Sequence, residues 1–184
     1  MNLPNKLTLL RVILIPFFLL FMYIDFPFHY AVALVIFAAA SITDALDGKI
    51  ARKRGLVTNF GKFMDPIADK LLVMSAFVVL VGQGRMPSWA CIIVLGREFV
   101  ISGFRLVAAD AGRVIAAGPL GKIKTVTQMA AVLLLLLLSP VTGEAPLGEG
   151  GKVFADVVMY ISTFFSLVSC VDYIARNRDC LKDR

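Results

Sequence analysis

The chain has 184 residues, of which 59% are hydrophobic and 17% charged, and its formal net charge is +6. Soluble domains are usually about 45–50% apolar, so this composition excludes an ordinary soluble domain and favours an integral membrane protein. The three cysteines, Cys91, Cys170 and Cys180, are too scattered to form a disulfide framework or a metal-binding pair.

Six apolar stretches are long enough to cross a bilayer, which takes roughly 20 residues of helix. They cover about residues 7–24, 30–50, 63–81, 88–107, 122–139 and 153–174. The sequence therefore predicts an all-α integral membrane protein with six transmembrane helices and short connections, in a single domain over residues 1–184. The amino-terminal stretch "MNLPNKLTLLR" is predicted to be a short amphipathic lead-in at the membrane interface.

The basic residues are distributed unevenly between the two ends of these helices. With a cytoplasmic amino terminus and six crossings, Arg85 and Lys152 lie at outer connections. Lys70 and Arg97 lie within helices, and all the others of the 19 Lys and Arg residues fall on the cytoplasmic side. The positive-inside rule thus predicts that both termini are cytoplasmic. The net charge indicates topology in the cell membrane and attraction to anionic lipid, not binding of nucleic acid.

Four aspartates lie near the cytoplasmic ends of the second and third stretches. An ionisable residue inside a span costs roughly 3 kcal/mol at the bilayer centre, so such residues indicate a functional site. Asp44 and Asp47, three residues apart, share one helix face, and Asp65 and Asp69, four apart, share another. Because the two helices form an antiparallel hairpin that turns near residues 55–56, we expect the two pairs to face each other at equal depth.

Four converging carboxylates repel one another unless they hold protons or cations. Oxygen ligands with no histidine or cysteine nearby select Mg²⁺ or Mn²⁺ over zinc, and two such ions suit a phosphoryl-transfer reaction. Gly48 and Ala51 leave space beside the acids, and Arg52 offers a fork that fits a phosphate. The alternative is a structural hairpin in which neighbouring lysines and arginines balance the acids, but it does not explain the matched depth or the small residues.

The spacing of these residues resembles a known signature. The pattern is Asp44-x-x-Asp47-Gly48-x-x-Ala51-Arg52, eight residues, then Gly61-x-x-x-Asp65-x-x-x-Asp69. It is similar to the signature of the CDP-alcohol phosphotransferase family, whose core is also a bundle of six helices. The resemblance covers essentially the whole chain.

The resemblance implies a role for each signature position. Two divalent ions, Mg²⁺ or Mn²⁺, would be bound by Asp44, Asp47, Asp65 and Asp69. The cytidine diphosphate part of a CDP-diacylglycerol donor would be held by Gly48, Ala51, Arg52, Thr58 and Gly61. Asp69 would also be the catalytic base on the acceptor hydroxyl, which attacks the β-phosphorus while CMP leaves. We expect direct transfer, since no cysteine, serine or histidine stands out as a covalent nucleophile.

The second half of the chain indicates which alcohol is the acceptor. The stretches "GREFVISGFR" (96–105) and "GKIKTVTQ" (121–128) resemble those of phosphatidylglycerophosphate synthases, the branch of the family whose acceptor is glycerol 3-phosphate. The candidates for binding the acceptor phosphate are Arg97, Arg105, Lys122, Lys124 and Thr125. Alternatives stay open: the lysines as topology signals, Arg97 and Glu98 as a structural pair, or inositol phosphate, serine or phosphatidylglycerol as the acceptor.

Other classes of membrane protein also carry buried acids. Intramembrane prenyltransferases use aspartate-rich motifs but are longer, with more helices. A cation transporter needs a polar path across the bilayer, whereas here the outer halves of the spans hold almost no polar residues. We therefore expect an enzyme. Members of the family commonly pair, which is compatible with a homodimer, although the sequence shows no interface.

Overall fold

The structure is a computed structural model. It describes residues 3–54, 59–110, 112–113, 115–116, 118–138 and 148–181. Within the helices, the side chains of residues 3–4, 44–54, 59–60, 62–63, 65–66, 69 and 181 lie outside the description. The described part of the chain contains helices and turns but no strand, which confirms the all-α prediction.

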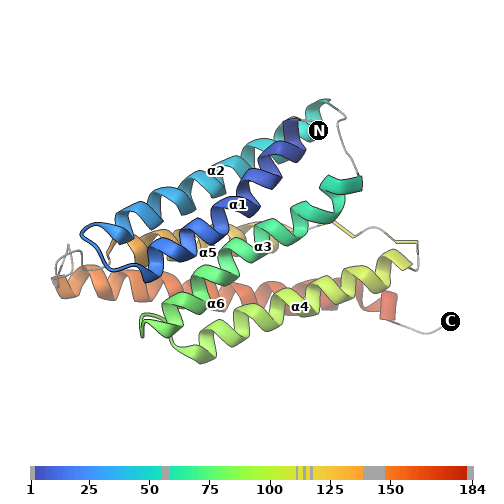
Figure 1. The fold of residues 1–184 in the computed structure, drawn as a ribbon. Coiled ribbons are helices and arrows are strands. Elements are labelled where there is room, and N and C mark those ends of the chain that lie inside the picture. The colour runs from blue at the N-terminus through green and yellow to red at the C-terminus, as the bar shows by residue number, and fades with distance from the viewer. Residues whose placement is uncertain are drawn as a thin grey trace.

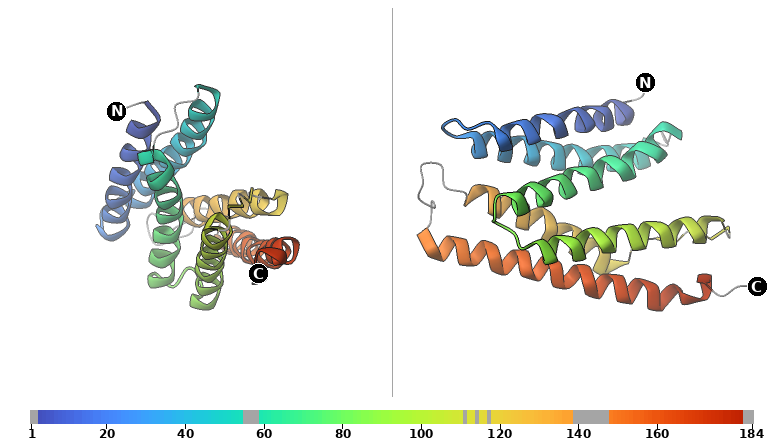
Figure 2. Two further views of the ribbon diagram at one scale, coloured as in Figure 1. Left: turned by 90° about the vertical axis from the view of Figure 1, so that its right-hand side faces the viewer. Right: turned by 60° about the horizontal axis from the view of Figure 1, so that its bottom comes forward.

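Six long helices follow one another along the described chain. They are α1 (Leu3–Tyr23), α2 (His29–Arg54), α3 (Asn59–Gly82), α4 (Ser88–Asp110), α5 (Pro119–Leu137) and α6 (Gly148–Asn177), and a short 3-10 helix, η1 (Arg178–Leu181), follows α6. The helices lie side by side in an elongated bundle, and both ends of the chain lie at the same end of it (Figure 1; Figure 2). This is the arrangement expected of a chain that crosses an even number of times.

Glycine and proline mark two of the connections. Between α3 and α4, Gly84 has a φ of 69°, a left-handed conformation that glycine adopts without strain. Pro119 is the first residue of α5, where its missing N–H leaves no hydrogen bond unmade, and Gly118 before it is extended. The sequence therefore stops and restarts the helices at these positions.

Helices α1 and α2 pack closely along an apolar face. Phe18 of α1 and Phe37 of α2 are fully buried, and their ring centroids lie 5.7 Å apart. Ala33 and Ala40, each about one turn from Phe37, are also fully buried. Small residues at these positions let two helix backbones approach each other, as is common between helices in membranes.

The inner face of α6 is lined by small residues. The residues buried along it include Gly151, Ala155, Ser162, Ser166 and Ser169, which recur at spacings of three, four or seven positions. This spacing places them on one side of the helix, and α6 packs against both α4 and α5. The small side chains let α6 pack closely against α4 and α5, beside the site described below.

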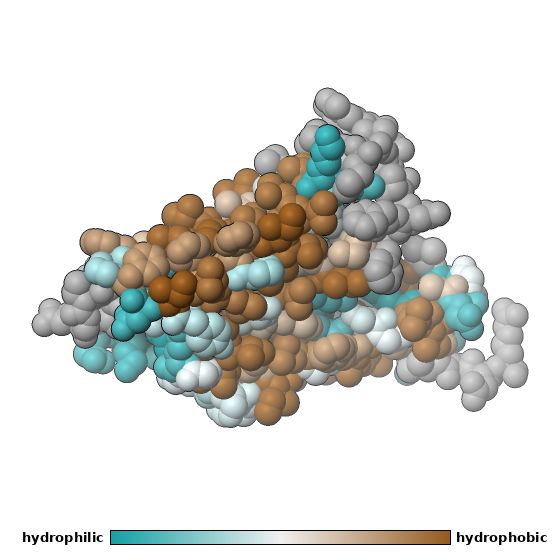
Figure 3. All heavy atoms as spheres, in the orientation of Figure 1, coloured by the Kyte–Doolittle hydropathy of each residue, from teal (hydrophilic) through white to brown (hydrophobic). Residues whose placement is uncertain are grey.

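The outward faces of the bundle are strongly apolar. Val35, Phe99, Val126 and Val171, from four different helices, are each at least 66% exposed. The apolar surface covers the middle of the bundle, and hydrophilic residues gather towards its ends (Figure 3). A soluble monomer rarely exposes apolar patches of this extent, so the surface indicates a membrane-embedded protein.

The described helices differ in how clearly they are suited to cross a membrane. Three segments are long and apolar enough by themselves: Asn5–Tyr23, Pro119–Leu137 and Gly148–Cys180. Shorter apolar segments lie at His29–Thr43 and Lys70–Gly82. The six helices occur where the sequence predicts them, and six crossings remain a prediction.

The Phe18–Phe37 contact predicts a large effect of substitution. Phe37→Ala should destabilise the bundle by about 3 kcal/mol or more, because it leaves a cavity between α1 and α2. The apparent melting temperature of the detergent-solubilised protein measures the loss. The matched control is Val35→Ala on the outward face of α2, which should change it little. Equal effects of the two substitutions would contradict the assigned packing.

Candidate functional site

The aspartates predicted as metal ligands lie on two consecutive helices that contact each other. Helix α2 runs through the positions of Asp44 and Asp47 to Arg54, and α3 contains Asp65 and Asp69. The side chains of these aspartates lie outside the described residues. Their convergence on a pair of ions therefore stays a prediction.

The positions predicted to hold the donor lie in the same part of the chain. Gly48, Ala51 and Arg52 belong to the last turns of α2, and Thr58 lies outside the described residues. Gly61, in the first turn of α3, is buried. Among the side chains that the structure describes, no group of three or more His, Cys, Asp or Glu residues is placed to hold a metal.

A pocket of about 230 Å³ opens between α3, α4 and α5. We call it the basic pocket. Its lining residues are Lys70, Val73, Met74, Val94, Arg97, Glu98, Arg105, Gly121, Lys124, Thr125, Gln128 and Met129. The three contributing helices come from both halves of the sequence, so the pocket exists only in the folded bundle.

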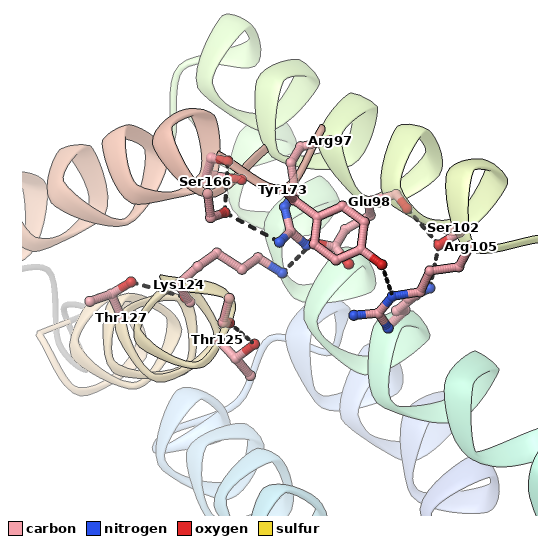
Figure 4. Close-up of polar contacts among 12 residues, drawn as sticks. Arg97, Glu98, Ser102, Arg105, Lys124, Thr125, Thr127, Ser166 and Tyr173 are labelled. Atoms are coloured by element: carbon pink, nitrogen blue, oxygen red, sulfur yellow. Dashed lines mark hydrogen bonds and ion pairs between the residues drawn. The ribbon is translucent and has the colours of Figure 1, made fainter. Parts of the chain in front are cut away.

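Glu98 is the acidic residue of the basic pocket, and it is 7% exposed. Its Oε1 accepts hydrogen bonds from Nη1 of Arg97, at 2.8 Å, and from Nζ of Lys124 (Figure 4). Arg97 also donates from Nη2 to Oγ of Ser169 in α6, at 3.2 Å. A buried carboxylate is tolerated when it is paired and hydrogen-bonded, and these contacts fix two cations relative to α4, α5 and α6.

Two further cations lie along the basic pocket. Lys70 of α3 donates to Oγ of Ser102, which in turn donates to the backbone carbonyl of Glu98 at 2.6 Å. Nε of Arg105 donates to the hydroxyl of Tyr173 at 3.1 Å, and its guanidinium lies 5.4 Å from the centre of that ring. Arg105 is exposed, so it can also reach a ligand at the edge of the pocket.

The charges of the basic pocket favour an anion. The described lining residues include four cations and one carboxylate, an excess of three positive charges in a partly water-excluded space. Electrostatic attraction is stronger there than in water, and a phosphate can accept several charge-assisted hydrogen bonds at once. The volume is below the roughly 300–1,000 Å³ of drug-sized sites, so it suits a small phosphorylated molecule.

Four of the five side chains predicted for an acceptor phosphate line this pocket. Arg97, Arg105, Lys124 and Thr125 do, whereas Lys122 is exposed and does not. Residues two apart on a helix point about 200° apart, so Lys122 and Lys124 cannot face the same pocket. The Thr125 hydroxyl donates to a backbone carbonyl of its own helix at 3.1 Å, which leaves its lone pairs to face a ligand.

Sequence reasoning missed two polar residues of the pocket. Lys70 was expected only to lie within a helix or to balance the aspartates, and Gln128 lies in the stretch 121–128 without a predicted role. Both adjoin long apolar runs, and a single polar side chain in such a run is the signal that could have identified them. Averaging hydropathy over a whole span hides that signal.

Comparison with known proteins gives a consistent family. The CDP-alcohol phosphatidyltransferase family matches residues 1–168. The CDP-diacylglycerol–glycerol-3-phosphate 3-phosphatidyltransferase of Bacillus subtilis is 43% identical over 98% of this chain and 97% of its own length. The enzyme of that name from Rickettsia typhi is 37% identical, covering 94% of each chain.

A similar protein from Mycobacterium tuberculosis carries a related name. This probable phosphatidylglycerophosphate synthase, from strain H37Rv, is 43% identical over 95% of this chain and 81% of its own length. Members of the matching family generally use divalent metal ions. With a family match over most of its length and full-length relatives well above 30% identity, the chain belongs to the CDP-alcohol phosphatidyltransferase family, and it is a transferase.

Proposed function

We propose that this chain transfers the phosphatidyl group of CDP-diacylglycerol to glycerol 3-phosphate and releases CMP, a step of phospholipid biosynthesis. The names of relatives that match almost the whole chain support this reaction. The observation from the structure that carries it is the basic pocket, because an excess of three positive charges suits a phosphorylated acceptor.

The donor side of the site would be formed by α2 and the start of α3. Arg52 would hold the diphosphate, while Gly48, Ala51 and Gly61 leave space for the nucleotide and Thr58 adds a hydroxyl. The lipid tails of the donor would stay in the bilayer, against the apolar outer faces of the bundle. An apolar chain suits this substrate because only the headgroup has to reach the site.

The metal ligands would be the four signature aspartates. Asp44, Asp47, Asp65 and Asp69 provide only oxygen atoms, a donor set that fits Mg²⁺ or Mn²⁺. Two such ions would neutralise charge on the diphosphate and on departing CMP. The carboxylates would in turn be relieved of the mutual repulsion that four clustered negative charges produce.

The acceptor would lie between the aspartates and the basic pocket. Asp69 directly precedes Lys70, which lines the pocket, so one stretch of α3 serves both. With its phosphate held by the cations, the acceptor's primary hydroxyl loses its proton to Asp69 and attacks the β-phosphorus. The new oxygen–phosphorus bond forms as the bond to CMP breaks, which transfers the phosphatidyl group in one step.

A related reaction with another acceptor is the second candidate. Inositol phosphate also carries a phosphate that the basic pocket could bind, whereas serine and phosphatidylglycerol lack a phosphomonoester. The relatives named for glycerol 3-phosphate favour that acceptor over inositol phosphate. The charge of the pocket disfavours the other two.

The orientation in the membrane follows from charge and from the common end of the termini. We propose a single domain that crosses the cell membrane six times, with the termini, the aspartates and the basic pocket towards the cytoplasm. Both termini lie at one end of the bundle (Figure 1), which supports an even number of crossings. A homodimer is part of this proposal on the ground of the family alone.

The acceptor assignment predicts a simple assay result. Purified protein with CDP-diacylglycerol and Mg²⁺ should release CMP rapidly when glycerol 3-phosphate is added, and slowly with inositol phosphate or serine. Faster CMP release with inositol phosphate than with glycerol 3-phosphate would overturn the assignment of the acceptor. It would still agree with a phosphate-binding role of the pocket. Faster release with serine would overturn both.

Asp69→Asn tests the proposed base. Because the amide cannot take the proton of the acceptor hydroxyl, CMP release should fall about 100-fold or more. Binding of CDP-diacylglycerol should be largely retained. The rise in melting temperature that the bound donor causes measures this binding. Loss of donor binding together with turnover would instead make Asp69 chiefly a metal ligand.

Arg105→Ala tests the acceptor side of the site. Removing one of four cations should raise KM for glycerol 3-phosphate by roughly 10-fold and leave KM for CDP-diacylglycerol unchanged. Arg176→Ala is the matched control, since Arg176 is exposed and pairs with Asp172 on α6, away from the pocket. If both variants keep the KM for glycerol 3-phosphate of the unmodified chain, Arg105 does not bind the acceptor and only contributes positive charge on the cytoplasmic side.

A further inference from the structure

Gln128 is a buried polar residue whose amide is incompletely bonded. It lies in α5 and is 2% exposed. Its Nε2 atom is buried and donates no hydrogen bond among the residues that the structure describes. Nothing in the metal or donor sites proposed above uses this residue.

The surroundings of Gln128 in the sequence make a polar side chain costly. Helix α5 is one of the three segments that are long and apolar enough to cross a bilayer, and Gln128 lies near its middle. Ala131 and Val132, about one turn further on, belong to the apolar core. An amide that leaves water without a new partner is destabilising, so an apolar residue would fit the empty protein better. A ligand bound in the pocket that Gln128 lines would supply such a partner.

The basic pocket is where that ligand would lie. Gln128 lines it and is one turn from Lys124 on the same face of α5. The Nε atom of Arg97, across the pocket in α4, is a second buried donor without a partner in the described residues. Two unused donors and a lysine around one small pocket call for a ligand group that offers several acceptor oxygens and negative charge.

The direction of the helices indicates which part of the acceptor reaches Gln128. Helices α3 and α5 both start at the end of the bundle that carries the chain termini (Figure 1). Asp69 precedes the residues of α3 that line the pocket, whereas Gln128 is near the far end of the lining residues of α5. The reacting hydroxyl belongs beside Asp69, which leaves the phosphate for the far end of the pocket.

We propose that Gln128 is a substrate-binding residue that donates its amide N–H to a phosphate oxygen of the acceptor, beside Nε of Arg97 and the ammonium of Lys124. This inference rests on the proposed function, because it assigns a subsite of the same reaction. Glu98 takes part as a positioning residue: its Oε1 holds both cations and so aims them at the phosphate.

Gln128→Met tests the assignment with a side chain of similar length that lacks the donor. KM for glycerol 3-phosphate should rise roughly 10- to 100-fold, the effect of one hydrogen bond to a charged group. The value of kcat and KM for CDP-diacylglycerol should be unchanged, since this bond is the same in the ground state and the transition state. Inorganic phosphate, used as a competitive inhibitor, should lose affinity by the same factor.

Two comparisons separate this role from a structural one. Thr127→Val alters the neighbouring residue, whose hydroxyl bonds the backbone carbonyl of Lys124 at 2.9 Å outside the pocket, and should leave both constants unchanged. Without ligand, Gln128→Met should melt at the same or a higher temperature than the unmodified chain. Added phosphate should raise the melting temperature of the unmodified chain more than that of the variant.

Three results would overturn the assignment. In the first, Gln128→Met leaves both KM for glycerol 3-phosphate and the inhibition constant of inorganic phosphate unchanged. In the second, KM rises but the inhibition constant does not, which would place the amide on the glycerol part of the acceptor. In the third, the ligand-free variant melts at a lower temperature than the unmodified chain. Failure of the proposed function gives a different result, in which the unmodified chain releases no CMP with glycerol 3-phosphate. The comparison of phosphate-dependent melting still tests Gln128 in that case.

Discussion

Glu98 holds Arg97 and Lys124 inside a bundle whose core is mainly apolar. Burying a cation without a partner is strongly unfavourable, so neither basic side chain would stay in place if the carboxylate were absent. Packing between apolar helices in lipid gives little directional information. The contacts of Glu98 with Lys124, and of Arg97 with Ser169 of α6, therefore fix α4 relative to its neighbours and shape the basic pocket at once.

Electrostatic repulsion gives a reason for the separation of acidic and basic residues between different helices. In the proposed reaction an anionic acceptor would approach an anionic donor next to the four signature aspartates, and their carboxylates would repel the acceptor. The signature places the carboxylates on α2 and α3, and the cations of the pocket come from α3, α4 and α5. Lys70 is the residue at which the two regions adjoin, one position after Asp69. An acceptor whose phosphate is bound in the pocket would thus bring its hydroxyl to the aspartates without its phosphate first passing them.

The sequence predicts the helices well because apolar runs and helices coincide. The predicted spans 30–50 and 153–174 lie within longer helices, since α2 extends to Arg54 and α6 covers Gly148–Asn177. Backbone hydrogen bonds continue a helix into polar residues, which hydropathy excludes. The side chains of the aspartates lie outside the description, so the central prediction about the site depends on spacing alone.

The periodicity of residues along a helix does not predict which side chains of different helices contact each other. The helical period shows that Lys122 and Lys124 point in different directions. The sequence does not show that Lys124 donates a hydrogen bond to Oε1 of Glu98, which is 26 residues away. The same reasoning makes a neutral residue at position 128 intelligible. A further cation at this position would repel Arg97 and Lys124, and among the described lining residues Glu98 is the one carboxylate that could offset it. In the proposed role, an amide offers a hydrogen-bond donor at the far end of the pocket without adding charge, at the cost of a buried N–H that has no partner in the ligand-free bundle.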